Sequence, residues 1–220
     1  MSNRVNKPEV LQRIRDIGLI PVVRAESAEL AMRAVEAISA GGVAVLEVTM
    51  TVPGAIGVIG KLAAACGDQV LIGAGTVLDP ETAQACMNAG AQFIVSPSLN
   101  EETIAFCRDN ELAVFPGALT PTEVVRAWKA GADAVKVFPA GAVGGASYLK
   151  ALKAPLPQIE LIPTGGVSLK TAADLIKAGA MALGVGADLV DTKALREGRE
   201  ESITDRARQF LEVVREARGS

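Results

Sequence analysis

The sequence predicts an α/β fold in which eight β-strands alternate with helices and close into a (β/α)8 TIM barrel, with an extra helix at the N-terminus. Short apolar runs alternate with amphipathic stretches along the chain, and an alanine-glycine step recurs at residues 40–42, 89–91, 130–132 and 178–180. Glycine there fits a left-handed helix C-cap before the next strand. Connections are short and no shift in composition marks a linker, so residues 1–220 are expected to form one domain. The same alternation also allows an open, doubly wound parallel sheet.

Apolar periodicity and helix signals set the expected elements in order. The apolar stripe of residues 7–17 predicts the extra helix. Ser27 and the Gly41-Gly42 pair mark the start and the stop of the next helix, and Pro53 is expected at the first position of the one after it. Expected strands cover residues 19–24, 43–49, 70–76, 93–96, 113–116, 134–138, 160–163 and 182–186, and the remaining expected helices cover 80–89, 101–108, 121–129, 148–153, 169–178 and 203–216.

Composition and charge exclude several classes of protein. Half of the residues are hydrophobic, 22 are glycine and only 3% are aromatic, which suits helices packed closely on β-branched strands. The net charge is −3 and there is no long basic block, so neither nucleic acid nor a membrane surface is an expected partner. Apolar runs are short and interrupted, which argues against a spanning helix or a signal peptide and predicts a cytoplasmic protein.

The chain contains no histidine, and this limits its chemistry. Zinc-dependent hydrolases and metal-dependent aldolases normally need imidazole ligands, and a serine-histidine triad is impossible. Acid-base catalysis must therefore rely on carboxylates, lysine, tyrosine or bound water. Cys66, Cys86 and Cys107 have no metal-ligand spacing and are expected to be buried free thiols.

The clearest candidate for chemistry is Lys136, in the middle of the apolar strand at residues 134–138. Side chains alternate between the two faces of a strand, so Lys136 shares a face with Ala134 and Phe138. On an edge strand this lysine would lie in water or in a surface salt bridge. Inside a closed barrel it is desolvated, which lowers its pKa and makes the neutral amine a nucleophile toward carbonyl carbon. We therefore predict that Lys136 forms a Schiff base.

Other candidate groups lie at the carboxyl ends of the expected strands, where the reacting groups of barrels collect. Glu47 points inward if it shares the face of Val45, and there it either forms a structural pair with Lys136 or transfers protons. Arg24 either binds a substrate carboxylate in bidentate fashion or pairs with Glu26 or Glu47. The remaining positions at these ends are Thr76, Ser96, Pro97, Pro116, Gly117, Phe138 and two glycine turns.

The glycine turns distinguish a phosphate site from a dinucleotide site. Gly184-Val185-Gly186 and Gly73-Ala74-Gly75 each supply only two of the three glycines of a dinucleotide fingerprint, so a nicotinamide cofactor is not expected. Thr164-Gly165-Gly166 follows the seventh strand and precedes a helix, where backbone N–H groups and the helix N-terminus can bind phosphate. A tight strand-to-helix turn without a ligand is the alternative.

Taken together, these motifs resemble those of the 2-keto-3-deoxy-6-phosphogluconate (KDPG) aldolase family, whose members often also cleave 4-hydroxy-2-oxoglutarate. The resemblance implies a class I aldolase of the TIM-barrel fold, a homotrimer, with no metal or organic cofactor. Its substrate would be a phosphorylated 2-keto sugar acid and one product pyruvate. The motifs that carry it, in the family's order, lie at residues 41–49, 73–77, 95–97, 115–117, 135–140 and 163–167.

The resemblance also implies roles for single residues. Lys136 would be the Schiff-base nucleophile, and Glu47 the general acid and base, working through water. Thr76 would help to hold the keto-acid carboxylate, and the Gly165-Gly166 backbone would donate to the phosphate. The full set of implied substrate-binding residues is Arg24, Thr76, Pro97, Phe138, Thr164, Gly165, Gly166 and Gly186.

Two positions depart from the family pattern. Thr51 stands shortly after Glu47, where many members carry an arginine, and Arg24 is then expected to bind the carboxylate. Ala187 follows the last glycine turn, where many members have a serine, so one hydroxyl donor worth about 1.5–3 kcal/mol to a charged phosphate is missing.

The predicted reaction is cleavage of KDPG to pyruvate and D-glyceraldehyde 3-phosphate, with 4-hydroxy-2-oxoglutarate as a second substrate. Two alternatives stay open at this point. One is the same chemistry on 2-dehydro-3-deoxy-6-phosphogalactonate, and the other is a trimeric barrel that serves as a scaffold without catalysis.

Overall fold

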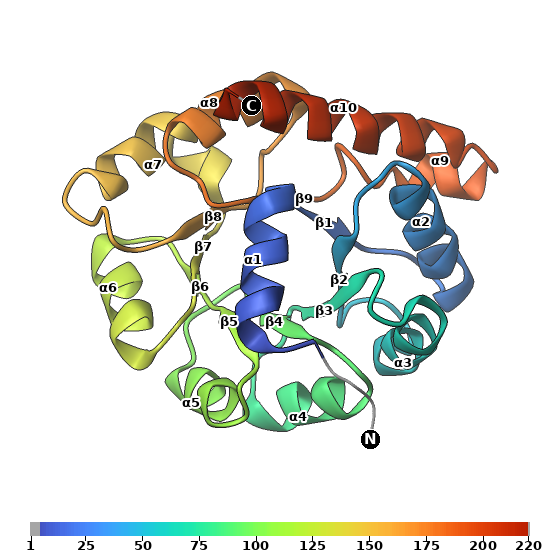
Figure 1. Cartoon of the computed structure of the whole chain (residues 1–220), viewed down its shortest axis with the longest axis horizontal. Helices are drawn as coiled ribbons and strands as arrows, with labels where there is room; N and C mark the ends of the chain where they lie inside the picture. The colour runs from blue at the N-terminus through green and yellow to red at the C-terminus, as the bar shows by residue number, and fades with distance from the viewer. Residues whose placement is uncertain (1–4, 220) are drawn as a thin grey trace.

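The computed structural model describes residues 5–219, which form a ring of parallel strands enclosed by helices (Figure 1). The predicted TIM barrel is therefore confirmed. The strands are β1 (Leu19–Val23), β2 (Val45–Thr49), β3 (Leu71–Gly75), β4 (Phe93–Val95), β5 (Ala113–Phe115), β6 (Gly117–Ala118), β7 (Val135–Val137), β8 (Leu161–Pro163) and β9 (Leu183–Val185). The helices are α1 (Lys7–Ile17), α2 (Ala28–Ala40), α3 (Ala55–Cys66), α4 (Pro80–Asn88), α5 (Glu101–Asp109), α6 (Pro121–Ala130), η1 (Ala140–Val143), α7 (Ala146–Lys153), α8 (Leu169–Lys177), α9 (Thr192–Arg196) and α10 (Glu201–Arg218).

The ring closes through two arcs of hydrogen-bonded strands. One arc has the order β5-β4-β3-β2-β1-β9 and the other β6-β7-β8, with all pairs parallel. β5 and β6 are successive parts of one strand, interrupted at Pro116, which has no N–H to donate. Single bridges, Leu161 to Ala180 and Thr164 to Gly184, join β8 to β9. Because the ring closes, the open doubly wound sheet is excluded.

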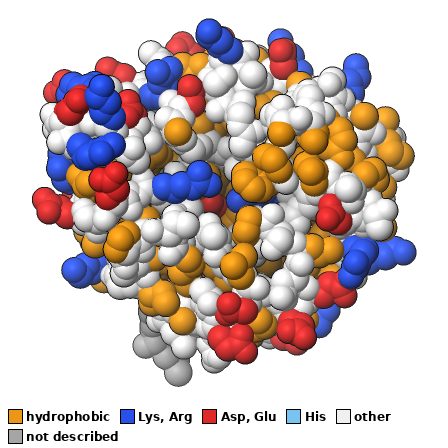
Figure 2. Space-filling model, turned by 180° about the vertical axis from the view of Figure 1, so that it is seen from behind, with side chains coloured by type: hydrophobic (Ala, Val, Ile, Leu, Met, Phe, Trp, Pro, Cys, Tyr) orange, Lys and Arg blue, Asp and Glu red, His pale blue; other side chains and the backbone are white. Residues whose placement is uncertain are grey.

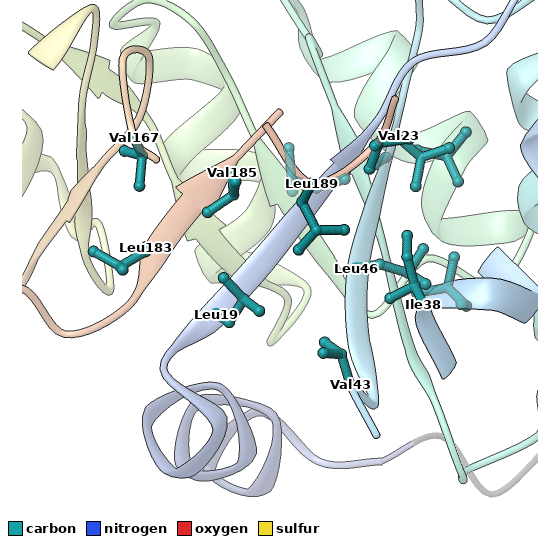
Figure 3. Packing of buried hydrophobic residues seen from close by; sticks show 14 of the residues in the cluster. Leu19, Val23, Ile38, Val43, Leu46, Val167, Leu183, Val185 and Leu189 are labelled. Atoms are coloured by element: carbon teal, nitrogen blue, oxygen red, sulfur yellow. The ribbon is translucent and has the colours of Figure 1, made fainter. Parts of the chain in front are cut away.

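Alternating side chains divide the core into two layers. On β1, Leu19 belongs to an outer cluster between strands and helices, together with Leu46 of β2 and Ile38 of α2 (Figure 3). The next residue, Ile20, belongs to an inner cluster with Val45 of β2 and others inside the ring. A side chain on the inner face of a strand is therefore covered by the opposite strands and is kept from water.

The extra helix α1 covers the amino end of the ring and lies across its centre in Figure 1. Its apolar stripe faces inward, since Val10 and Ile14 are part of the inner cluster. The Asn6 side chain accepts the N–H of Glu9 at its start, and Gly18 ends it in the left-handed region at φ 67°. With this end closed, only the carboxyl ends of the strands are left as an entrance.

Most predicted boundaries hold to within one or two residues, but one local prediction was wrong and two short helices were missed. Pro53 is not the first residue of a helix, because the next residue, Gly54, has φ 68°, which is outside the right-handed helical region. Helix α3 begins at Ala55. The short helices η1 and α9 were not expected. The left-handed glycine expected at each alanine-glycine joint is confirmed, as Gly42 at φ 92°, Gly90 at φ 107°, Gly131 at φ 105° and Gly179 at φ 98°.

The remaining structural expectations concern the thiols and the membrane. Cys86 and Cys107 are buried and Cys66 is half-buried, and none of the three forms a disulfide within residues 5–219. Burial raises the pKa of the Cys86 thiol to about 11, with a smaller contribution from Asp79. Within residues 5–219 no helix is both long and apolar enough to cross a membrane.

Candidate active site

Lys136 and Glu47 project into the interior of the barrel from opposite parts of the ring. Lys136 is the middle residue of β7 and is 4% exposed, and Glu47 is the middle residue of β2 and is 2% exposed. Both side chains line one inner cavity, with Thr164 and the ring of Phe115 among its other walls. The cavity has a volume of about 10 Å³, which is the room for about one water molecule. The inward direction predicted for both residues is confirmed.

The electrostatic state of the pair follows from burial first and from charge second. Burial lowers the pKa of the Lys136 amine, the Glu47 carboxylate opposes this, and Arg24 adds to the lowering. Burial raises the pKa of the Glu47 carboxyl, and the positive charges of Lys136 and Arg24 oppose that rise. The Nζ atom of Lys136 also lies 5.1 Å from the centroid of the Phe138 ring. A buried amine with a lowered pKa can attack a carbonyl, and the nearby carboxyl group can exchange protons.

The Glu47 carboxylate is packed closely against the backbone of the neighbouring strand. Its Oε1 atom is buried and has no hydrogen-bond partner among the described residues. A Cβ atom placed at Gly75, on the neighbouring strand β3, would lie 2.6 Å from this oxygen. The bare backbone at Gly75 therefore makes the space for the carboxylate. An unpartnered buried oxygen of this kind calls for an explanation, and a catalytic role supplies one.

A second pocket lies directly outside the inner cavity, at the carboxyl ends of the strands. This mouth pocket has a volume of about 400 Å³ and shares Thr164 with the inner cavity. Figure 2 shows this face of the molecule, where a basic side chain lies beside a hollow near the centre. The residues that line the mouth pocket are Val22, Arg24, Phe138, Thr164, Gly165, Gly166, Val167, Ser168, Gly186, Ala187 and Asp188. The cavity that Lys136 lines is therefore next to a pocket at the surface, and Thr164 is a wall of both.

Six of the eight expected binding residues lie in this pocket, and two lie elsewhere. Thr76 follows β3 with φ 62°, an uncommon conformation for a residue with a branched side chain, and it is half-buried. Pro97 follows β4 and packs its carbonyl against Gly117 of β6. Neither residue lines the inner cavity or the mouth pocket, so their contact with a ligand stays a prediction.

Arg24 is exposed at the end of β1, and its side chain forms no ion pair within residues 5–219. The alternative of a salt bridge with Glu26 was wrong, because Glu26 pairs with Arg196 at 3.4 Å. The Nη1 atom of Arg24 lies 3.9 Å from the point where a Cβ of Gly186 would stand. The guanidinium group is thus at the edge of the mouth pocket, where it can receive an anionic group.

Sequence reasoning missed Asp188, which lines the mouth pocket beside the last glycine turn. It accepts a hydrogen bond from the backbone N–H of Leu169 at 3.2 Å. Its position two residues after Gly186 was a signal that could have singled it out, because the residues after a strand end face the mouth of a barrel.

A larger groove of about 540 Å³ lies outside the ring, between α10 and the end of α1, but its charged groups already have structural partners. Arg218 donates to the carbonyl oxygens of Arg15, Asp16 and Met181. The groove contains neither of the buried ionisable residues, and the candidate site is therefore the one inside the barrel.

Comparison with known families now decides the assignment. A model of the aldolase family described as KDPG and KHG aldolase matches residues 10–206. The chain belongs to this family. KDPG and KHG aldolases are carbon–carbon lyases, and the chain is a class I aldolase, which acts through a Schiff base.

Relatives of this aldolase match over nearly its whole length. The 2-dehydro-3-deoxy-phosphogluconate aldolase of Treponema pallidum (strain Nichols) is 35% identical over 206 residues, 94% of this chain and 96% of that protein. A structure described as native KDPGal has a TM-score of 0.85 and 35% identity, and the match covers 92% of this chain and 96% of that one. The KDPG aldolase of Legionella pneumophila, crystallised with pyruvate as a covalent carbinolamine, has a TM-score of 0.83 and 31% identity over 90% of this chain and 96% of that one.

Proposed function

We propose that this aldolase cleaves KDPG to pyruvate and D-glyceraldehyde 3-phosphate, and 4-hydroxy-2-oxoglutarate to pyruvate and glyoxylate. In this proposal Lys136 is the nucleophile and Glu47 the general acid and base. The observation that carries it is the meeting of one buried amine and one buried carboxyl group at a single small cavity inside the closed ring. Family membership favours an enzyme over the alternative of a barrel scaffold without catalysis.

The first half of the reaction forms the Schiff base. The neutral Lys136 amine adds to the C2 carbonyl carbon of the keto acid and forms a carbinolamine. The carbinolamine hydroxyl then takes a proton from the Glu47 carboxyl group and leaves as water, and the product is a protonated imine. Arg24 at the edge of the mouth pocket is the proposed partner of the substrate carboxylate. The lowered pKa of Lys136 raises the share of free amine that is present near neutral pH.

The second half breaks the C3–C4 bond. Glu47 accepts the proton of the C4 hydroxyl group, directly or through one water molecule, and the C4–O bond becomes the aldehyde carbonyl. The electron pair of the C3–C4 bond moves into the imine, which becomes an enamine. The aldehyde leaves, C3 of the enamine is protonated, and hydrolysis of the imine returns pyruvate and free Lys136.

Trapping of the Schiff base tests the nucleophile. The protein is incubated with pyruvate, reduced with borohydride and digested, and the modified peptide is sequenced by mass spectrometry. We expect one adduct, on Lys136, and none in Lys136→Ala. Lys150→Ala is the matched control, because Lys150 is an exposed lysine of α7 outside the ring. An adduct on Lys150 or Lys153, or no adduct at all, would remove Lys136 from the mechanism.

The aldehyde part of the substrate needs a separate assay. Parallel kcat/KM measurements with KDPG, 2-dehydro-3-deoxy-6-phosphogalactonate and 4-hydroxy-2-oxoglutarate separate the three substrates. The phosphogalactonate is the second candidate, because the structure described as native KDPGal is as similar in sequence, at 35% identity, as the Treponema aldolase. The single domain, the homotrimer and the cytoplasmic location expected from the sequence stay predictions.

A further inference from the structure

Thr76 has a backbone conformation that its branched side chain disfavours. It follows β3 with φ 62°, in the left-handed region, and the residue before it, Gly75, is the one that packs against the Glu47 carboxylate. The left-handed region brings Cβ close to the following carbonyl oxygen, so a residue branched at Cβ seldom adopts it. Such a conformation persists only where surrounding contacts hold it, and positions of this kind cluster at active sites. The neighbours that hold Thr76 therefore decide where its side chain points.

Hydrogen bonds from two neighbouring strand ends fix the peptide groups on each side of Thr76. Before it, the carbonyl oxygen of Gly75 accepts the N–H of Met50, which follows β2, at 2.8 Å. After it, the N–H of Val77 donates to the carbonyl oxygen of Val95, the last residue of β4, at 3.2 Å. The Val77 side chain is also fully buried in the outer cluster. The ends of β2 and β4 thus set the direction of the chain before and after Thr76.

Ser96 adds a side-chain hydrogen bond between the end of β4 and this loop. Its hydroxyl group donates to the carbonyl oxygen of Val77 at 2.6 Å, and the bond is buried. Ser96 is 3% exposed, and Val95 directly before it lines the inner cavity. Because successive side chains alternate in direction, the Ser96 hydroxyl points away from that cavity. Ser96 therefore acts on the backbone of the loop after β3 and not on a ligand.

The two hydrogen bonds to Val77 leave Thr76 little freedom. Both polar backbone groups of Val77 are bonded to the end of β4, so this residue cannot turn. Thr76 has to connect it to the fixed carbonyl group of Gly75. Without the Ser96 hydroxyl, the Val77 carbonyl oxygen loses a buried partner, and Thr76 can relax out of the left-handed region.

We infer that Ser96 is a positioning residue that holds Thr76 in its left-handed conformation, with the Thr76 hydroxyl group directed toward the carboxylate of the keto acid. The inference rests on the proposed function and on the contact expected between Thr76 and that carboxylate. Loss of the Ser96 hydroxyl then weakens the binding of the keto acid. Lys136 lies on β7 and keeps its position, so it still forms the Schiff base once the keto acid is bound.

A double-mutant cycle tests whether Ser96 acts through Thr76. The four proteins are the wild type, Ser96→Ala, Thr76→Ala and the double variant. The measured quantity is the pyruvate concentration that gives half-maximal borohydride trapping on Lys136, and circular dichroism checks the folding of each protein. Thr204→Ala is the matched control, because the Thr204 hydroxyl, on α10, donates to the carbonyl oxygen of Ala37 at 2.9 Å outside the ring. Ser96→Cys keeps a side chain of similar size with a weaker donor, and it replaces Ser96→Ala if that variant does not fold.

We expect the half-saturating pyruvate concentration to rise about tenfold in Ser96→Ala and about tenfold in Thr76→Ala, as for the loss of one hydrogen bond to a charged group. In the double variant the rise should stay about tenfold, because Ser96 has no Thr76 hydroxyl left to position. Ser96→Cys should show a smaller rise of about threefold, since its S–H group is a weak donor. Thr204→Ala should bind pyruvate like the wild type, and every variant should give the Lys136 adduct at saturating pyruvate.

Four results would overturn the inference. They are an unchanged half-saturating concentration in Ser96→Ala or, in its place, in Ser96→Cys, an unchanged concentration in Thr76→Ala, an equal rise in Thr204→Ala, and a rise of about 100-fold in the double variant, which would mean that the two residues act independently. Each of these results leaves the adduct on Lys136 at saturating pyruvate in place. The absence of that adduct in the wild type would remove the proposed function as well.

Discussion

The space at Gly75 offers a way to move the Glu47 carboxylate without changing its chemistry. In Gly75→Ala the new methyl carbon would lie 2.6 Å from Oε1 and 2.8 Å from Cδ of Glu47. Ordinary van der Waals contact begins near 3.4 Å, so the carboxylate must move by about 0.8 Å. The inner cavity of about 10 Å³ gives it little room to do so without disturbing the position opposite Lys136.

A displacement of this size has a predictable effect on catalysis. Misplacement of a reacting group by about 1 Å can cost about 100-fold in rate, or about 2.7 kcal/mol of activation free energy. We therefore expect kcat for cleavage to fall by about 10- to 100-fold in Gly75→Ala. Trapping of pyruvate on Lys136 should persist, because the amine is not the group that moves.

Three measurements decide the outcome. Pyruvate release is followed with a coupled dehydrogenase, imine formation by borohydride trapping, and folding by circular dichroism and thermal unfolding. Gly57→Ala is the control, because Gly57 lies in α3 and a Cβ there meets no atom within 4 Å. A folded Gly75→Ala protein that cleaves at the wild-type rate would refute the idea that the position of the Glu47 carboxylate limits the reaction.

Three further predictions concern Lys136, Glu47 and Arg24. Glu47→Gln should still trap pyruvate on Lys136 but lose most cleavage, and unimpaired pyruvate release by this variant would deny Glu47 its role in proton transfer. The pH profile of trapping should have its midpoint below 10.5, the ordinary value for lysine, because burial lowers the pKa of Lys136. The carboxylate raises that pKa and Arg24 lowers it, so Glu47→Gln should move the midpoint to lower pH and Arg24→Gln to higher pH. Shifts in the same direction, or none, would contradict this account of the charges.

The direction of Lys136 could be predicted because a strand has a strict two-residue period. Once the lysine shares the face of Ala134, and the ring is closed by the count of strands, the amine must be inside. Glu47 follows from Val45 by the same rule, and both residues lie where the sequence indicated. These are properties of local geometry and element count, which a single sequence records well.

Features that depend on turns and on contacts between loops were beyond such reasoning. Thr76 adopts a left-handed conformation that its residue type gives no reason to expect. Helix α3 begins after Gly54, which has a left-handed conformation, and not at Pro53. Asp188 meets the Leu169 N–H only because the loops after β8 and β9 lie side by side at the mouth of the barrel, 19 residues apart in sequence. Nothing in the local pattern around either residue encodes that meeting.

Helix α1 closes the amino end of the ring, so the barrel interior opens to solvent only at the carboxyl ends of the strands. Whatever reaches the amine must arrive, and depart, by one route. In the proposed mechanism the keto-acid fragment is bound to Lys136 at the bottom of this route, so the aldehyde leaves first and the keto acid follows it. This order of release also allows an aldehyde to bind while pyruvate is still attached as the enamine. That arrangement favours carbon–carbon bond formation in the reverse direction.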